Sequence, residues 1–289
     1  MLTPFLQAVG YGLVTSSVIA LSAVALSLQW KVSNIPNFAH GEFLTVGAYG
    51  AMVAQVFTNN LAVDAAFGIA LSAAVAAASN IAFIEPFLRR KANITTLFVV
   101  TIGISLIVQN VITLAFGAQV QTYSMGLQQL QHVGPFLWTT PEILVMAAAG
   151  GVMLGLHLLL QYTSFGRALR AVADDRQLAR ACGIDTGRVV NLTWLLAGGI
   201  AGLGGFTLAA SSGSFDPGMG FGFLLVTFAA AVIGGIGRPY GAMGGALIVG
   251  IATEVSAAYL SSGYKQVIAV SLLILFLLIR PAGLFSRET

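Results

Sequence analysis

Charged residues are scarce in this sequence, and cysteine is almost absent. Asp, Glu, Lys and Arg together make up 8% of the 289 residues, whereas a typical soluble domain contains about 25%. So few ionic groups are not enough to cover the water-facing surface of a chain this long. The single cysteine, Cys182, excludes an internal disulfide and any cysteine-rich metal site. The composition therefore indicates that most of the chain faces lipid.

The sequence also lacks the motifs that mark enzymes. A Walker A phosphate loop needs a glycine directly before its lysine, and none of Lys31, Lys91 and Lys265 follows a glycine. There is no nucleophile–base pair, no cofactor fingerprint and no cluster of metal-ligating residues at suitable spacing. We therefore expect a protein that is not an enzyme, has no cofactor and does not hydrolyse ATP itself.

Long apolar runs are abundant instead. Hydrophobic residues make up 57% of the chain, and runs of roughly 17–25 apolar residues are long enough to cross a bilayer as helices. The first basic residue, Lys31, follows the first run, whereas a signal peptide carries its positive charge before the apolar segment; we expect this run to be retained. The expected spans cover residues 5–29, 39–57, 64–84, 94–117, 142–163, 190–211, 241–260 and 264–280, and a shorter stretch at 222–236 either spans or re-enters.

These runs predict an all-α integral membrane protein, a polytopic bundle of about eight or nine transmembrane helices in one domain over residues 1–289. Basic residues gather between the runs, and the positive-inside rule places such clusters in the cytoplasm. Loop 118–141 contains no Lys or Arg, so we expect it outside and the C-terminus inside. Counting back places the almost uncharged N-terminus outside. None of the clusters forms a stripe suited to nucleic acid. They are Arg89, Arg90 and Lys91; Arg167, Arg170, Arg176, Arg180 and Arg188; and Arg280 and Arg287.

The cytoplasmic loop at about 164–190 carries the signals of a short helix. Asp174 is a good N-cap, and Gln177 lies three residues later, as a capping box requires. Gly183 is a natural stop after the C-cap. We therefore expect a helix of about two turns between Asp174 and Gly183.

The two sides of this expected helix differ. Arg176 and Arg180 are i, i+4 neighbours on one side, and Leu178 and Cys182 are i, i+4 neighbours on the other. A helix this short is not stable alone in water, so we expect the apolar side to pack on the membrane domain and the basic side to face the cytoplasm. A docking site for a cytoplasmic partner and a basic loop lying on anionic lipid both fit this charge pattern.

The same loop resembles the ATPase-binding loop of bacterial ABC importer permeases. Small residues followed by glycine characterise that loop, and Ala179, Ala181 and Gly183 match them, although the glutamate that often opens the motif is absent. Gly-Arg-Ala-Leu-Arg-Ala at 166–171, followed by Asp-Arg at 175–176, is more closely similar to LivH-type branched-chain amino acid permeases. The resemblance implies an ATPase-coupling loop that contains Arg167, Arg170, Asp174, Asp175, Arg176, Ala179, Arg180 and Gly183.

Polar residues interrupt the apolar sequence where the second apolar run begins. The segment Asn37-Phe38-Ala39-His40-Gly41-Glu42 is similar to a signature of the same family, which does not say what His40 and Glu42 do. Ionisable groups at membrane depth are costly unless paired or hydrated, so they are functional candidates. The alternative is that these residues are solvated at the interface and merely start a helix. A zinc site is not expected, because residues two apart diverge on a helix and no third ligand is near.

The C-terminal half adds further matches to the LivH-type pattern. They are the turn at 234–242, which contains Gly-Arg-Pro, with Glu254 after it, and the ending Arg-Pro-Ala-Gly-Leu-Phe at 280–285. The glycines between Gly198 and Gly205 are spaced for close helix packing. Glu254 fits either the solute pathway or helix packing. The translocation-pathway candidates are therefore Asn37, His40, Glu42 and Glu254.

The resemblance implies the permease subunit of an ATP-driven ABC importer for branched-chain amino acids or related small polar solutes such as amides and urea. It further implies cytoplasmic ATPase subunits, a second permease subunit that is identical or homologous, an extracytoplasmic solute-binding protein, and a bacterial or archaeal cell membrane. The alternative is a stand-alone secondary transporter or channel that uses buried ionisable groups for coupling.

Overall fold

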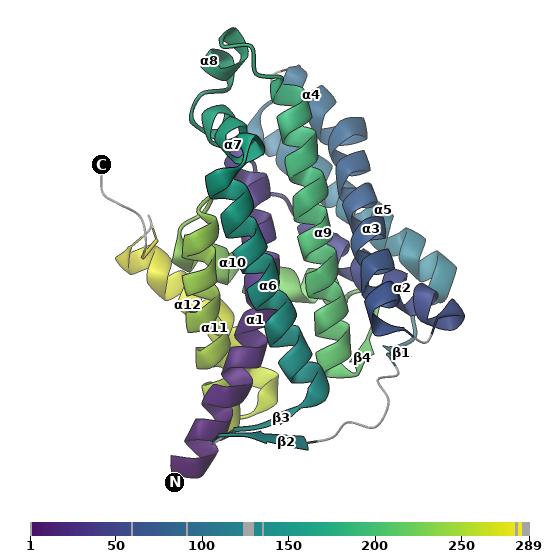
Figure 1. The fold of residues 1–289 in the computed structure, drawn as a ribbon, viewed down its shortest axis with the longest axis vertical. Helices are drawn as coiled ribbons and strands as arrows, with labels where there is room; N and C mark the ends of the chain where they lie inside the picture. Colours follow the sequence, from purple (N-terminus) through teal and green to yellow (C-terminus); the bar gives the residue numbers. More distant parts are fainter. Residues whose placement is uncertain are drawn as a thin grey trace.

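The computed structural model describes residues 2–58, 60–90, 92–123, 130–134, 136–280 and 283–284. It is a bundle of helices, with short strands at the end of the bundle where α1 begins (Figure 1). The helices are α1 (Leu2–Ser33), α2 (His40–Phe57), α3 (Leu61–Ser79), α4 (Glu85–Arg89), α5 (Ile94–Phe116), α6 (Thr140–Tyr162), α7 (Ser164–Asp174), α8 (Arg176–Ala181), α9 (Thr186–Ser212), α10 (Met219–Gly234), α11 (Pro239–Tyr259) and α12 (Lys265–Ile279).

A π-helical turn, Asn80–Ile84, joins α3 to α4, and a 3₁₀ turn, Ser262–Tyr264, precedes α12. The strands β1 (Gln121–Thr122) and β4 (Ser214–Phe215) pair antiparallel, as do β2 (Leu130–Val133) and β3 (Phe136–Thr139). Figure 1 shows these strands at one end of the bundle and α4, α7 and α8 at the other.

The predicted all-α polytopic fold is confirmed. Within the described residues, seven helices are long and apolar enough to cross a membrane. The other two expected spans correspond to α2, with 18 residues, and α10, with 16. At 1.5 Å per residue α10 is about 24 Å long, less than the hydrocarbon thickness of about 30 Å, so its length leaves the choice between spanning and re-entry open. Lys91, Arg287 and residues 281, 282 and 285 of the C-terminal motif lie outside the described residues.

Glycines bring the central helices into backbone contact. A Cβ added at Gly205 of α9 would overlap the carbonyl group of Leu44 in α2, and one added at Gly202 would overlap the side chain of Ser72 in α3. The Ser72 hydroxyl bridges two of these helices, because it lies 2.7 Å from both Phe43 O in α2 and Gly198 O in α9 and can donate its proton to either. The close packing predicted for the glycines of α9 is therefore present, on two neighbouring helices at once.

The second helix begins inside the bundle rather than at its end. After Ser33 ends α1, the chain turns back, and Ile35, Asn37 and Ala39 are all buried. Asn34 adopts a positive φ of 53° at this reversal, a conformation that asparagine tolerates better than most residues. The polar segment before α2 is therefore enclosed by protein, which contradicts the alternative that it is solvated at the interface.

Candidate functional site

The predicted coupling loop contains two helices rather than one. The first, α7, buries Leu169 and Val172 and leaves Arg167 exposed. Its N-cap is Thr163, whose hydroxyl accepts from Gly166 N at 3.1 Å. Sequence reasoning missed this helix, although the i, i+3 spacing of the two apolar residues after a threonine cap was a usable signal.

The N-cap of the second helix was predicted one residue too early. Asp174 is the last residue of α7, and Asp175 caps α8: its Oδ1 accepts from Gln177 N at 2.7 Å and from Leu178 N at 2.9 Å. Gln177 is then the second helical residue, so the expected capping box is wrong. The reason is that α7 continues through Asp174, which leaves only Asp175 in the extended conformation that an N-cap needs.

The predicted stop at Gly183 is confirmed. Gly183 has φ +83° and its N–H donates to Arg180 O, while Ile184 N donates to Ala179 O, both at 3.0 Å. This pair of bonds is a Schellman motif, which satisfies the last carbonyls of the helix. It also turns the chain sharply into α9.

The predicted orientation of α8 is wrong for its apolar residues and for Arg176, whereas Arg180 is exposed as predicted. Leu178 is 62% exposed and Cys182 is exposed, whereas Ala179 is 4% exposed. Arg176 is half-buried, and its Nε is buried without a hydrogen-bond partner in the described part of the chain. The helix therefore rests on its small alanine and turns its larger apolar side chains outward.

An acidic residue that sequence reasoning missed explains this orientation. Glu85 in α4 is 6% exposed, receives a hydrogen bond from Arg89 Nη2 at 2.8 Å, and interacts electrostatically with Arg176. Burial lowers the pKa of Arg176, and the carboxylate of Glu85 opposes that effect. Glu85 could have been found in the sequence, because it is a lone acid four residues before Arg89, which is the spacing of a helical ion pair.

A wide cleft of about 1120 Å³ separates α4 from α8. Glu85, Arg89, Arg176 and Arg180 all line it, and Arg180 Nη2 also donates to Thr186 Oγ1 at 3.1 Å. The cleft thus combines one buried acid with several cationic side chains beside an exposed apolar helix face. Such a surface can receive a protein segment that is partly acidic and partly apolar.

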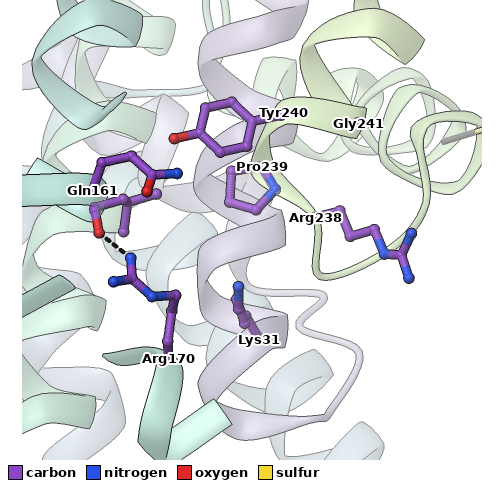
Figure 2. Close-up of a pocket in the computed structure, with 8 residues that line it drawn as sticks. Lys31, Gln161, Arg170, Arg238, Pro239, Tyr240 and Gly241 are labelled. Carbon is purple, nitrogen blue, oxygen red and sulfur yellow. Dashed lines mark hydrogen bonds between the residues drawn. The ribbon is translucent and has the colours of Figure 1, made fainter. Parts of the chain in front are cut away.

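The remaining predicted coupling residue on α7 lies elsewhere. Arg170 Nη1 donates to the carbonyl oxygen of Leu160 at the end of α6, and its side chain borders a separate pocket with Lys31 (Figure 2). The structure therefore places Arg170 in a different pocket from the predicted coupling residues Arg176 and Arg180, which line the cleft between α4 and α8.

Two of the pathway candidates, Asn37 and His40, lie in a buried polar cluster at the start of α2. His40 is 0% exposed and Asn37 is 1% exposed. Gln29 Oε1 of α1 lies 3.1 Å from His40 Nδ1 and accepts from Asn37 Nδ2 at 2.9 Å. On its other side, His40 Nε2 lies 3.1 Å from Ser22 O, and the Ser22 hydroxyl lies 2.9 Å from the hydroxyl of Thr227 in α10.

Glu42, two residues after His40, makes a separate buried polar contact with α5. Its side chain is 0% exposed, and Ser105 Oγ donates to its Oε1 at 3.0 Å. The second carboxyl oxygen is buried without a partner in the described residues. Ser22 and Gln29 were missed as partners, although their spacing of seven residues places them on one face of α1. The polar cluster around His40 joins α2 to α1 and α10, and the separate contact of Glu42 joins α2 to α5.

Glu254 lies apart from this cluster. Its Oε1 is 2.6 Å from Lys265 Nζ at the start of α12 and accepts from Thr15 Oγ1 of α1 at 2.7 Å. Three helices therefore meet at this carboxylate, an arrangement that favours the packing alternative for Glu254.

The chain matches known transport proteins over nearly its whole length. The family model described as "Branched-chain amino acid transport system / permease component" matches residues 8–278. The high-affinity branched-chain amino acid transport system permease protein LivH of Escherichia coli strain K12 is 34% identical over 98% of this chain and 96% of its own length. The corresponding protein BraD of Pseudomonas aeruginosa is 30% identical over the same shares of the two chains.

An archaeal protein is similar as well: the probable branched-chain amino acid transport permease protein LivH of Methanocaldococcus jannaschii is 30% identical over 94% of this chain and 90% of its own length. Bacterial and archaeal relatives thus align with the bundle from α1 to α12. A match of this length includes both the buried polar cluster and the α7–α8 segment. The chain is a transport permease rather than an enzyme, and it belongs to the family of branched-chain amino acid transport system permease components.

Proposed function

We propose that this chain is the single-domain permease subunit, over residues 1–289, of an ATP-driven ABC importer for branched-chain amino acids or related small polar solutes. The observation that carries the proposal is the surface formed by α8 and its cleft. Leu178 and Cys182 are exposed there, next to a half-buried Arg176 whose Nε has no partner in the described residues. A buried N–H without a partner is costly, and a docked protein segment can supply the missing acceptor.

An ATPase is the partner that this surface supports best. The sequence contains no phosphate loop of its own, so the energy for uptake must come from another subunit. The docking segment continues through the turn at Gly183 directly into α9. A push on α8 would therefore reach a helix that packs against α2 and α3 through its glycines. This connection supports alternating access driven by closure of the ATPase.

The opposite end of the bundle is the proposed outer face. Tyr123 next to β1 donates from its hydroxyl to Asp64 Oδ2 at 2.6 Å, and Thr58 Oγ1 donates to Asp64 Oδ1 at 2.8 Å. These bonds and the β1–β4 pair hold the connections of this end together. We propose that the solute-binding protein docks here, that a second permease subunit completes the pathway, and that the C-terminus is cytoplasmic.

The proposed substrates follow from the names of the relatives, which are branched-chain amino acid permeases. Amides and urea remain within the proposed range because the motif resemblance covers carriers of these solutes. Asn37, His40 and Glu42 are proposed to stabilise the start of α2 beside the pathway, since all three are enclosed by protein in this conformation.

Copurification from the native host tests the proposal. We expect a tagged permease to recover an ATPase, and Leu178→Asp to abolish the recovery because it places a charge on the exposed apolar face of α8. Arg90→Gln is the matched control, since Arg90 is also exposed at this end but lies outside the cleft. A permease that is recovered alone and still moves solute into vesicles without ATP contradicts the proposal and supports a secondary transporter.

A further inference from the structure

A second cluster of basic side chains lies in a pocket of about 480 Å³ between the ends of four helices. Lys31 comes from the last turn of α1, Arg170 from α7, and Arg238 from the residue before α11, while Leu160 and Gln161 belong to α6. In Figure 2 the guanidinium group of Arg170 extends toward the end of α6 beside Gln161, and the side chain of Lys31 ends to its right in the view, below Pro239. In the same view the guanidinium group of Arg238 extends away from them on the other side of its turn.

The positive charge of this pocket is only partly compensated. In the described part of the chain, no carboxylate lies within ion-pair distance of Lys31 or Arg170, and the hydrogen bond of Arg170 goes to a neutral carbonyl group. At longer range Lys31 is attracted by the carboxylate of Asp174 and repelled by the guanidinium groups of Arg170 and Arg238. Lys31 thus lies near a second cation of the pocket, Arg170, and interacts with one acid at longer range. Because cations in a partly desolvated pocket are unfavourable without counter-charge, the pocket is suited to an anion.

The position of the pocket along the spans identifies the kind of anion. Two candidate spans end beside it, at Ser33 and Tyr162, and a third begins at Pro239. The pocket therefore lies at the level where the hydrocarbon region meets the lipid headgroups. Tyr240, 43% exposed on its rim, is an aromatic residue typical of this level. Further along α6 the exposed side chain of Leu158 offers apolar surface to an acyl chain.

We propose that this pocket binds the phosphate group of an anionic phospholipid, with Lys31 and Arg170 contacting the phosphate oxygens. The planar guanidinium group of arginine matches phosphate geometry, and lysine adds a point charge. Basic pockets between membrane helices on the cytoplasmic side bind anionic headgroups by these interactions. A lipid at this place touches α1, α6, α7 and α11 at once, and so holds the base of the α7–α8 segment against the bundle. The inference stands whether or not α8 docks an ATPase.

The test measures lipid binding by the purified full-length chain. Native mass spectrometry counts bound lipid, and thermal unfolding in detergent reports stabilisation, with phosphatidylglycerol, phosphatidylcholine and inorganic phosphate as three separate probes. We expect phosphatidylglycerol to bind and to raise the unfolding midpoint, and the other two probes to do neither. Lys31→Gln should weaken phosphatidylglycerol binding by roughly fivefold, the contribution of one basic side chain near an anionic lipid surface.

Two further variants separate loss of the site from loss of the fold. Lys31→Arg keeps the charge and should retain binding, whereas Arg90→Gln removes one exposed charge at the same end of the molecule and should leave binding unchanged. If Lys31→Gln does not fold, Arg170→Gln carries the same expectation. Equal binding of both lipids, or equal effects of Lys31→Gln and Arg90→Gln, overturns the proposal. Stabilisation by inorganic phosphate alone overturns the lipid assignment and gives the pocket to a soluble phosphate compound.

Discussion

The junction at Glu254 gives a prediction whose magnitude follows from the structure. Its carboxylate has two partners, the Lys265 ammonium at 2.6 Å and the Thr15 hydroxyl at 2.7 Å. The side chain of Lys265 is 41% exposed and that of Glu254 is 14% exposed. Exposed ion pairs contribute about 0.2–1 kcal/mol, whereas a hydrogen bond to a charged group contributes about 1.5–3 kcal/mol. The hydrogen bond from the Thr15 hydroxyl should therefore contribute more to stability than the ion pair with Lys265, although threonine is the neutral partner.

We expect Thr15→Val to lower the free energy of unfolding by about 1.5–3 kcal/mol, and Lys265→Gln to lower it by about 1 kcal/mol or less. Equilibrium unfolding of the purified chain in mixed micelles measures both changes in free energy. The double variant Glu254→Gln/Lys265→Gln, compared with its two single variants, measures the coupling between the two charges. Solute uptake per folded molecule should stay unchanged in Glu254→Gln, because this carboxylate joins three helices at a distance from the polar cluster. A larger effect for Lys265→Gln than for Thr15→Val refutes the energetic reasoning, and a loss of uptake in a stable Glu254→Gln protein makes Glu254 a pathway residue.

Three other outcomes follow from single contacts. Gly205→Ala should destabilise the chain by about 1–3 kcal/mol, because its Cβ would overlap the backbone of α2, while Gly155→Ala, which meets open space, should not lower the unfolding midpoint. Cys182, the C-cap residue of α8, is exposed, so a maleimide should label it in the isolated permease and fail to label it when the ATPase is bound; equal labelling in both states contradicts the docking site. Tyr123→Phe should cost about 1.5–3 kcal/mol in the same unfolding assay, since it removes a donor from buried Asp64. Burial, with help from Asp64, raises the pKa of Tyr123, so this contribution should be full below the unfolded-state pKa of tyrosine, about 10, and be lost as the pH rises from there through the raised folded-state pKa.

The positions of the membrane helices could be predicted because hydropathy is a local property. Each expected span overlaps a helix of the structure, and the glycines from Gly198 to Gly205 lie against neighbouring helices as their spacing indicated. The helix stop at Gly183 was equally local, since only glycine adopts the required positive φ without strain. The one-residue error at Asp174 shows the limit of such signals. Two adjacent aspartates can both cap a helix, and the choice depended on how far α7 extends.

The orientation of α8 could not be predicted, because it depends on a contact that is remote in the sequence. Glu85 lies about ninety residues before Arg176 and attracts it into the cleft, which outweighs burial of Leu178 on a helix of only six residues. The partners of His40 were hidden for the same reason. Gln29 and Ser22 belong to a span that looks uniformly apolar, and only the reversal of the chain after α1 brings them to the start of α2.

The proposed docking surface and the buried polar cluster are joined by a continuous path of backbone contacts. The Schellman turn at Gly183 fixes the exit of α8 toward α9, and Gly202 of α9 then lies against Gly47 of α2 so closely that a Cβ on Gly47 would overlap the backbone of Gly202. Side chains that interdigitate can absorb a small shift by changing rotamer, whereas backbone atoms in direct contact cannot. We therefore expect a displacement of α8 that reaches α9 to be passed on to α2, whose first residues are His40 and Glu42. The polar side chains at the start of this helix can exchange partners at lower cost than a packed apolar core can, because each hydrogen bond lost can be replaced by another. The molecule thus places its rigid contacts between the docking surface and the cluster, and its exchangeable contacts inside the cluster.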